Sequence, residues 1–202
     1  RFNPHTGEAS TADQRQVSLL GAGWTAGSLK YVAESGAHSV TYYETTGQRG
    51  VMEREEPVHS ANAFPSMPGA VYPLYHILAD VGNYAGGRIV PSVSSDRLRV
   101  DGLTLQKGDR RRVLLANLRP DPQRVTVRGL GHGATVRPLD ETNAEEAMGH
   151  PARFRARPGQ RRKTEDGALD IRLRPYALVR IDSEGRNRRE NVTKGIILRH
   201  NR

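Results

Sequence analysis

The chain has 202 residues, a net charge of +9, no cysteine and 36% hydrophobic residues. The lack of cysteine excludes disulfide bonds, thiolate nucleophiles and cysteine-ligated metals. No apolar run approaches the roughly 20 residues that a membrane-spanning helix needs, so we expect no membrane partner. The chain begins with Arg1 and no signal-like stretch follows, so we expect a cytoplasmic protein whose N-terminus continues upstream or was removed.

The positive charge comes mainly from arginine, since only four of the 31 basic residues are lysines. Many arginines alternate with apolar residues in strand-like segments, and in half-buried strands this spacing would point each charge at water. These are Arg97, Arg99, Arg112, Arg124, Arg128, Arg137, Arg172 and Arg174. The denser basic clusters lack interleaved aromatic residues that could stack on bases. The sequence therefore predicts a solvated charged face and no nucleic-acid partner.

The first predicted element is a helix over residues 13–35, after a loop over 1–12. Val17, Leu20, Trp24, Ser28 and Tyr31 recur at spacings of three and four, which places them on one helix face. We therefore expect the single tryptophan to pack in the core.

A strand is predicted over residues 38–44, where β-branched and aromatic residues follow one another. A long loop follows over 45–68, and loops of this length are often functional. A second helix is predicted over 72–84, with Gly86 and Gly87 as its stop signal.

From residue 88 onward, short strand-like segments recur at spacings near ten residues with turn signals between them. This pattern predicts a β-sandwich domain over 88–183. Within it, the polar stretch 141–166 would hold one short helical turn and a loose basic loop. Residues 184–202 are polar and basic, and we expect them to be disordered.

The helix–strand–loop–helix pattern of residues 1–87 is an alternation of α and β elements cut short. One or two strands cannot close a barrel or bury a parallel sheet on both faces. We therefore predict an α/β plus all-β chain, in which the C-terminal end of a (β/α)8 barrel, incomplete here, precedes an antiparallel β-sandwich.

Several motifs carry a family resemblance over about residues 1–182. They are Arg1-Phe2-Asn3-Pro4, GWTAGSLKY from Gly23, TYYETTG from Thr41, Gly50-Val51-Met52-Glu53, YPLYHILAD from Tyr72 and LLANL from Leu114. In these motifs the chain resembles the D-apionate lactonase family and, more distantly, the last barrel strand and helix of retaining glycoside hydrolases of the Glu/Glu clan. The resemblance implies hydrolysis of a sugar-acid lactone in apiose breakdown, with the earlier barrel strands outside this chain.

The candidate catalytic residue is Glu44, which ends the predicted strand and opens the long loop. Barrel active sites lie at the C-terminal ends of the strands, and period-two alternation puts Tyr42 and Glu44 on one face. A carboxylate there could take a proton from the water that attacks a lactone carbonyl, or could hold substrate hydroxyls. The alternative is a surface ion pair between Glu44 and Arg49.

Tyr42, Arg1 and Asn3 are the candidate substrate contacts, because Arg1 and Asn3 would lie at the end of the preceding barrel strand. His59 lies near several glutamates without a fixed ligand spacing, so we expect no metal, and no motif calls for a cofactor.

Three functions stay open at this point. The first is a sugar-lactone hydrolase that acts on a small-molecule substrate, and the second is a glycoside hydrolase whose second carboxylate lies upstream. The third is a non-enzymatic β-sandwich that binds polyanions through arginine. For either enzyme, we expect residues 1–202 alone to be inactive, because most of the barrel mouth lies outside them.

Overall fold

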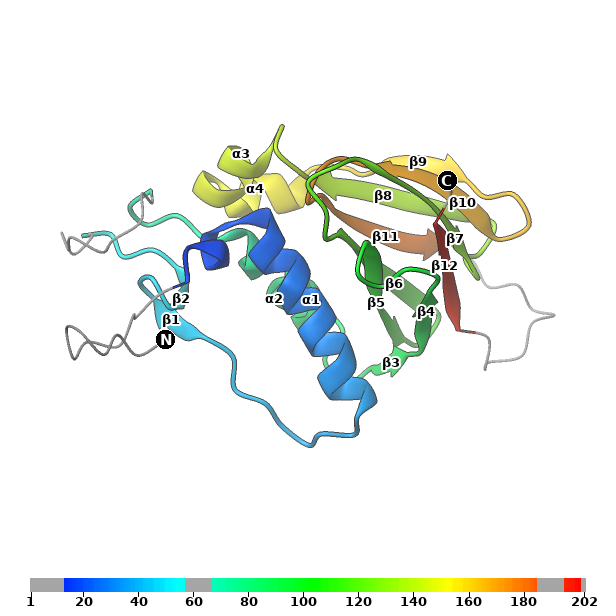
Figure 1. Ribbon diagram of the computed structural model, residues 1–202, viewed down its shortest axis with the longest axis horizontal. Helices are drawn as coiled ribbons and strands as arrows, with labels where there is room; N and C mark the ends of the chain where they lie inside the picture. The colour runs from blue at the N-terminus through cyan, green and yellow to red at the C-terminus, as the bar shows by residue number, and fades with distance from the viewer. Residues whose placement is uncertain (1–12, 57–66, 185–194, 201–202) are drawn as a thin grey trace.

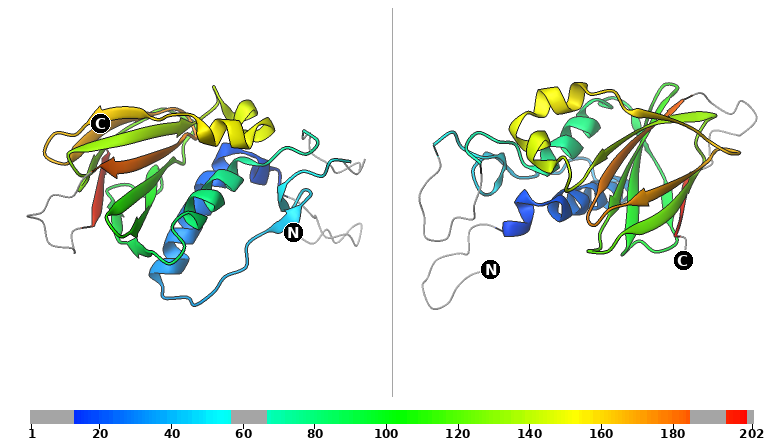
Figure 2. Two further views of the ribbon diagram at one scale, coloured as in Figure 1. Left: turned by 180° about the vertical axis from the view of Figure 1, so that it is seen from behind. Right: turned by 90° about the horizontal axis from the view of Figure 1, so that it is seen from above.

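The computed structural model of the protein describes residues 13–56, 67–184 and 195–200. It contains two packed β-sheets and a layer of helices (Figure 1). Figure 2 shows the helices gathered on one side of the two sheets. None of the helices in the described ranges is long and apolar enough to cross a membrane.

The first part of the chain contributes most of the helical layer. A 3₁₀ turn, η1 (Gln14–Val17), leads into α1 (Leu19–Glu34), whose N-terminus is capped by the Ser18 hydroxyl accepting from the Gly21 amide at 3.1 Å. Two short parallel strands follow, β1 (Glu44–Thr46) and β2 (Gly50–Met52). Helix α2 (Pro73–Gly82) then begins with proline at its first position, where the missing amide proton is tolerated.

The rest of the chain forms a sandwich of a six-stranded and a four-stranded sheet. The larger has the order β3-β5-β6-β11-β8-β9, and all its pairings are antiparallel. The smaller has the order β10-β7-β12-β4, and only β4 and β12 run parallel in it. Two short helices, α3 (Ala144–Gly149) and α4 (Pro151–Ala156), lie between β8 and β9 in sequence.

The strands of the larger sheet are β3 (Arg88–Val90), β5 (Val100–Lys107), β6 (Arg110–Asn117), β8 (Gly133–Leu139), β9 (Gln160–Lys163) and β11 (Leu178–Glu184). The smaller sheet consists of β4 (Ser92–Ser94), β7 (Gln123–Arg128), β10 (Ala168–Leu173) and β12 (Ile196–His200).

The larger sheet is apolar on both faces. In β6, Val113 and Leu115 pack in the core between the two sheets, whereas Leu114 and Ala116 pack against α1 and α2. The same alternation continues in β11, where Val179 faces the inter-sheet core. The fold therefore has two cores that share one sheet.

The predicted succession of helical segments and an antiparallel sandwich is confirmed, but two details are wrong. Residues 38–43 form no strand, and β1 starts where the predicted strand was to end. Trp24 is 71% exposed, because α1 buries its small residues instead, Ala22, Gly23 and Ala26 among them. A Cβ on Gly23 would lie 3.1 Å from Leu118 Cδ2, a tight contact, so glycine at this position lets α1 pack closely on the sheet.

Two predictions for the C-terminal half also need correction. In the stretch 141–166, the predicted helical turn is α3, but the loose basic loop expected after it holds α4 and β9. Within the tail expected to be disordered, residues 196–200 form β12 between β7 and β4. Ile196 and Leu198 alternate with exposed residues and are fully buried in the inter-sheet core, which explains why this short strand is ordered.

The role of β12 can be tested by two neighbouring truncations. Leu198→Ala should lower the free energy of unfolding by about 3 kcal/mol, because it leaves a cavity between the sheets. Ile197→Ala, at a side chain that is 45% exposed, should change it by roughly 0.5 kcal/mol. Urea unfolding measures both. Equal, small effects would mean that β12 does not belong to the core.

Candidate functional site

Glu44 is the first residue of β1, and its carboxylate is accessible to solvent. Arg49 Nη2 lies 2.6 Å from Glu44 Oε1, with the two side chains 59% and 54% exposed. The backbone reinforces this link, since the Glu44 amide donates to the Arg49 carbonyl at 3.0 Å. The structure thus contains the ion pair that was the alternative to a catalytic role, while leaving Glu44 open to a water or a ligand.

The tyrosines before Glu44 attach this segment to α1. The Tyr42 hydroxyl lies 2.7 Å from Ser28 Oγ, and the Tyr43 hydroxyl lies 2.7 Å from Thr25 Oγ1. Tyr43 also packs against the core between the helices and the sheet. Tyr42 is therefore engaged with α1 rather than with the Glu44–Arg49 pair. Arg1 and Asn3, the other two predicted substrate contacts, lie outside the described residues, as does His59.

A tight connection holds β1 and β2 side by side. The Gly47 amide donates to the Met52 carbonyl at 2.8 Å, and the Gly50 amide donates to the Gly47 carbonyl at 2.7 Å. A Cβ on Gly50 would lie 2.6 Å from the carbonyl carbon of Thr46, so no other residue fits there without a backbone shift. This close approach fixes Glu44 and Arg49 at the two ends of one turn.

The sequence did not single out Glu53 as a site residue, yet it follows β2 directly and is only 5% exposed. Its Oε2 accepts a hydrogen bond from the Tyr72 hydroxyl at 2.9 Å, and its Oε1 accepts from the Arg54 amide at 2.8 Å. The spacing between Glu53 and Tyr72 gives no signal in the sequence, because a long loop without a regular pattern separates them. Their contact joins the end of β2 to the start of α2.

The environment of Tyr72 favours its protonated form. Burial, and then the hydrogen bond to the Glu53 carboxylate, raise the pKa of Tyr72 well above its ordinary value. A buried carboxylate held by a phenol and an amide is suited to fixing the loop, whereas general-base chemistry needs access to water. In this region, Glu44, Glu55 and Glu56 are exposed carboxylates, and Glu44 is the one at the start of β1, whereas Glu53 is buried and structural. Among the described residues, no three histidine, aspartate or glutamate side chains gather into a metal site.

Comparison with protein families identifies the class of fold and then the family. Residues 2–86 match the model "D-apionate lactonase, TIM barrel domain", and residues 97–181 match the model "D-apionate lactonase, C-terminal immunoglobulin-like domain". The protein is thus made of the end of a TIM barrel followed by an immunoglobulin-like β-sandwich. Because the two models together cover most of its length, the chain belongs to the D-apionate lactonase family.

Solved structures agree on the fold. A GH30 endoxylanase from Clostridium papyrosolvens has a TM-score of 0.53 at 8% identity, over 83% of this chain and 39% of that one. A GH39 β-xylosidase from Caulobacter crescentus has a TM-score of 0.53 at 16% identity, over 89% and 43%. The chain therefore spans about two fifths of these structures. A search of curated sequences gives no match.

The Glu53–Tyr72 contact should stabilise the fold measurably. Tyr72→Phe removes the phenol that satisfies a buried carboxylate, and should lower the free energy of unfolding by about 2 kcal/mol in chemical denaturation. Tyr75→Phe is the matched control, since the Tyr75 hydroxyl has no hydrogen bond to any residue in the described ranges. Equal losses in the two variants would contradict a structural role for the contact.

Tyr72 should also make the free energy of unfolding fall at alkaline pH. In the unfolded chain, Tyr72 releases its proton above about pH 10, whereas the folded protein retains it because its pKa is raised. The folded state then binds one more proton, so stability is lost as pH rises. Between pH 10 and 12, the wild-type free energy of unfolding should fall faster than that of Tyr72→Phe, by about 1.4 kcal/mol per pH unit. Parallel curves would show that Tyr72 is not the group responsible.

Proposed function

We propose that the protein takes part in the hydrolysis of a sugar-acid lactone of the D-apionolactone type, with Glu44 as general base. The observation that carries the proposal is the match of both halves of the chain to one lactonase family. The accessible Glu44 carboxylate on the barrel segment supports the choice of residue. The substrate itself comes only from the family name.

The proposed reaction adds water to a cyclic ester. The Glu44 carboxylate takes a proton from a water molecule as the water oxygen attacks the lactone carbonyl carbon. The tetrahedral intermediate then collapses with cleavage of the bond from the former carbonyl carbon to the ring oxygen. The departing oxygen takes the proton back from Glu44, so the products are an open-chain hydroxy acid and the original carboxylate. Each atom of the water ends in the product.

Arg49 and the turn between β1 and β2 would position the base. The ion pair at 2.6 Å restricts the Glu44 side chain on one side, and the bonds around Gly47 and Gly50 restrict its backbone. Tyr42, Arg1 and Asn3 remain the proposed substrate contacts. The remaining barrel strands would enclose the substrate, since this chain spans about two fifths of the solved structures with this fold.

Substitution of the two glutamates separates a catalytic from a structural carboxylate. In the complete gene product that contains these residues, Glu44→Gln should lower kcat for D-apionolactone by about 10²–10⁴-fold at an unchanged melting temperature. Glu53→Gln should instead lower the melting temperature, because it disturbs the contact with Tyr72. Glu34→Gln, at the exposed last residue of α1, is the control for loss of a surface charge.

Three results would count against the proposal. Retention of wild-type kcat in Glu44→Gln would remove Glu44 from the mechanism. Turnover of the lactone by residues 1–202 alone would show that the missing barrel strands are not needed. Hydrolysis of an aryl xyloside instead of the lactone would favour the glycoside hydrolase alternative.

A further inference from the structure

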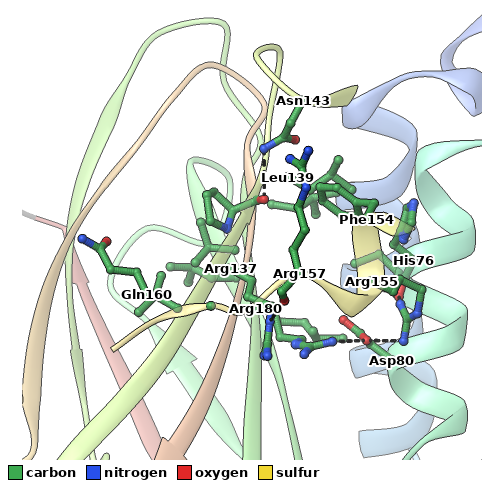
Figure 3. Close-up of a pocket in the computed structure, with 18 of the residues that line it drawn as sticks. His76, Asp80, Arg137, Leu139, Asn143, Phe154, Arg155, Arg157, Gln160 and Arg180 are labelled. Atoms are coloured by element: carbon green, nitrogen blue, oxygen red, sulfur yellow. Dashed lines mark hydrogen bonds and ion pairs between the residues drawn. The ribbon is translucent and has the colours of Figure 1, made fainter. Parts of the chain in front are cut away.

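A cavity of about 340 Å³ lies between the helical layer and the larger sheet, away from the β1–β2 turn. Its wall is formed by α2, α4, β8 and β11, together with the segment that leads into β9 (Figure 3). The volume falls at the lower end of the range of about 300–1,000 Å³ that is typical of small-molecule sites. It shares no residue with the proposed Glu44 site.

One wall is built around the buried carboxylate of Asp80 in α2. Three arginines from three different elements contact its Oδ1. They are Arg155 of α4 at 2.8 Å, Arg180 of β11 at 3.0 Å and Arg112 of β6 at 3.2 Å. Arg155 also donates to the His76 carbonyl at 3.3 Å, which closes α4 onto α2. The arrangement fixes the guanidinium groups in place before any ligand arrives.

A second carboxylate shares the same arginines. Asp182 of β11 accepts from Arg112 Nε at 2.6 Å and from Arg137 Nη1 at 3.0 Å, and Arg180 Nε lies 3.1 Å from its Oδ2. Four guanidinium groups therefore surround two carboxylates. The sequence predicted Arg112 and Arg137 in solvent, but Arg112 is only 8% exposed because it lies on the face that the helices cover.

The four arginine side chains, which give this wall its excess of positive charge, are largely buried. The Arg112, Arg180, Arg155 and Arg137 side chains are 10%, 15%, 20% and 29% exposed. Burying uncompensated charge is unfavourable, so this wall favours a diffusible anion. Burial, and then repulsion by Arg180, lower the pKa of Arg137, as a region of positive potential requires. Arg137 and Arg180 both line the cavity, and the Nη2 of each has no partner among the residues that the structure describes.

A buried acceptor lies in the same wall. His76 is 4% exposed, and its Nε2 lies 3.0 Å from the Ala147 carbonyl, which can only accept. Nε2 therefore carries the proton, and burial lowers the pKa of His76, which favours the neutral ring. Its Nδ1 is then an acceptor that is buried without a hydrogen-bond partner in the described structure. The same burial closes Nδ1 to a ligand in the cavity, so His76 shapes this wall without offering a polar contact.

We propose that this cavity binds a small organic carboxylate, which contacts Arg137 and Arg180. Guanidinium groups fit the planar carboxylate and can donate two hydrogen bonds to it. The remaining wall is partly apolar, with Ile77, Leu139 and Phe154, which suits a short carbon chain. Because the site is built from α2, α4 and the sandwich alone, it does not depend on the proposed lactonase activity.

Three six-carbon probes separate the parts of the proposal, by titration calorimetry of the 202-residue chain in low-salt buffer. Gluconate has both a carboxylate and hydroxyl groups, hexanoate has only the carboxylate, and sorbitol has only hydroxyl groups. Gluconate and hexanoate should each bind one-to-one, because both have the carboxylate, and sorbitol should not bind. Binding of sorbitol as tight as that of gluconate would overturn the role of the carboxylate. Equal heat from sodium chloride at the same ionic strength would overturn the anion site.

Matched arginine substitutions then locate the site. Arg137→Gln should raise the Kd for gluconate at least tenfold, while Asp182 keeps Arg112 and Arg180 as partners. Arg157→Gln, at a second cavity residue, should also weaken binding. Arg153→Gln is the control, because Arg153 shares Glu146 with Arg157 but does not line the cavity. Melting curves confirm that each variant folds. Unchanged affinity in both cavity variants, or an equal loss in Arg153→Gln, would refute the assignment.

Discussion

The larger sheet is apolar on both faces, and this constraint determines the rest of the fold. Successive residues of β6 alternate between the two cores, so neither face can be left in water without exposing a row of leucine and valine side chains. The four-stranded sheet covers one face, and α1 and α2 cover the other. The barrel segment and the sandwich therefore share a core, although their sequences change character near residue 87.

The helical cover explains features of α1 that are unusual for a helix on a sheet. Its buried face consists of small residues, which brings the helix close to the strands and leaves Trp24 outside. The same face carries Lys30, whose Nζ lies 2.6 Å from Asp101 Oδ1, with the side chains 3% and 5% exposed. Tyr31 donates to the other oxygen of Asp101 at 2.7 Å. Two charges buried this deeply are tolerated because each satisfies the other, and they fix the position of α1 along β5.

Local patterns in the sequence predicted most of the elements but not their partners. Alternation predicted most sandwich strands, because each strand carries its own two-sided pattern, as β10 and β11 do. It failed for Arg112, because the pattern cannot tell solvent from a helix that covers the same face. It also failed for residues 196–200, which become a strand only between β7 and β4. At the candidate site, Glu44 and Tyr42 could be named from sequence, but the contact of Glu53 with Tyr72 depends on how the loop folds back.

The cavity has a polar wall because the apolar contacts between α2 and the larger sheet end at Asp80. Helix α2 covers the sheet with Leu74 and Ile77, but one turn later Asp80 faces Arg112 and Arg180 of the strands beneath it. Electrical neutrality at this contact between α2 and the sheet would need one carboxylate for each arginine. Helix α4 instead adds Arg155 to the same aspartate. Apolar side chains would fill this contact at a lower electrostatic cost, since buried ion pairs rarely make a protein more stable than apolar side chains of similar size do. An excess of buried cations on the wall of a cavity is therefore better explained by an anionic ligand than by the needs of the fold.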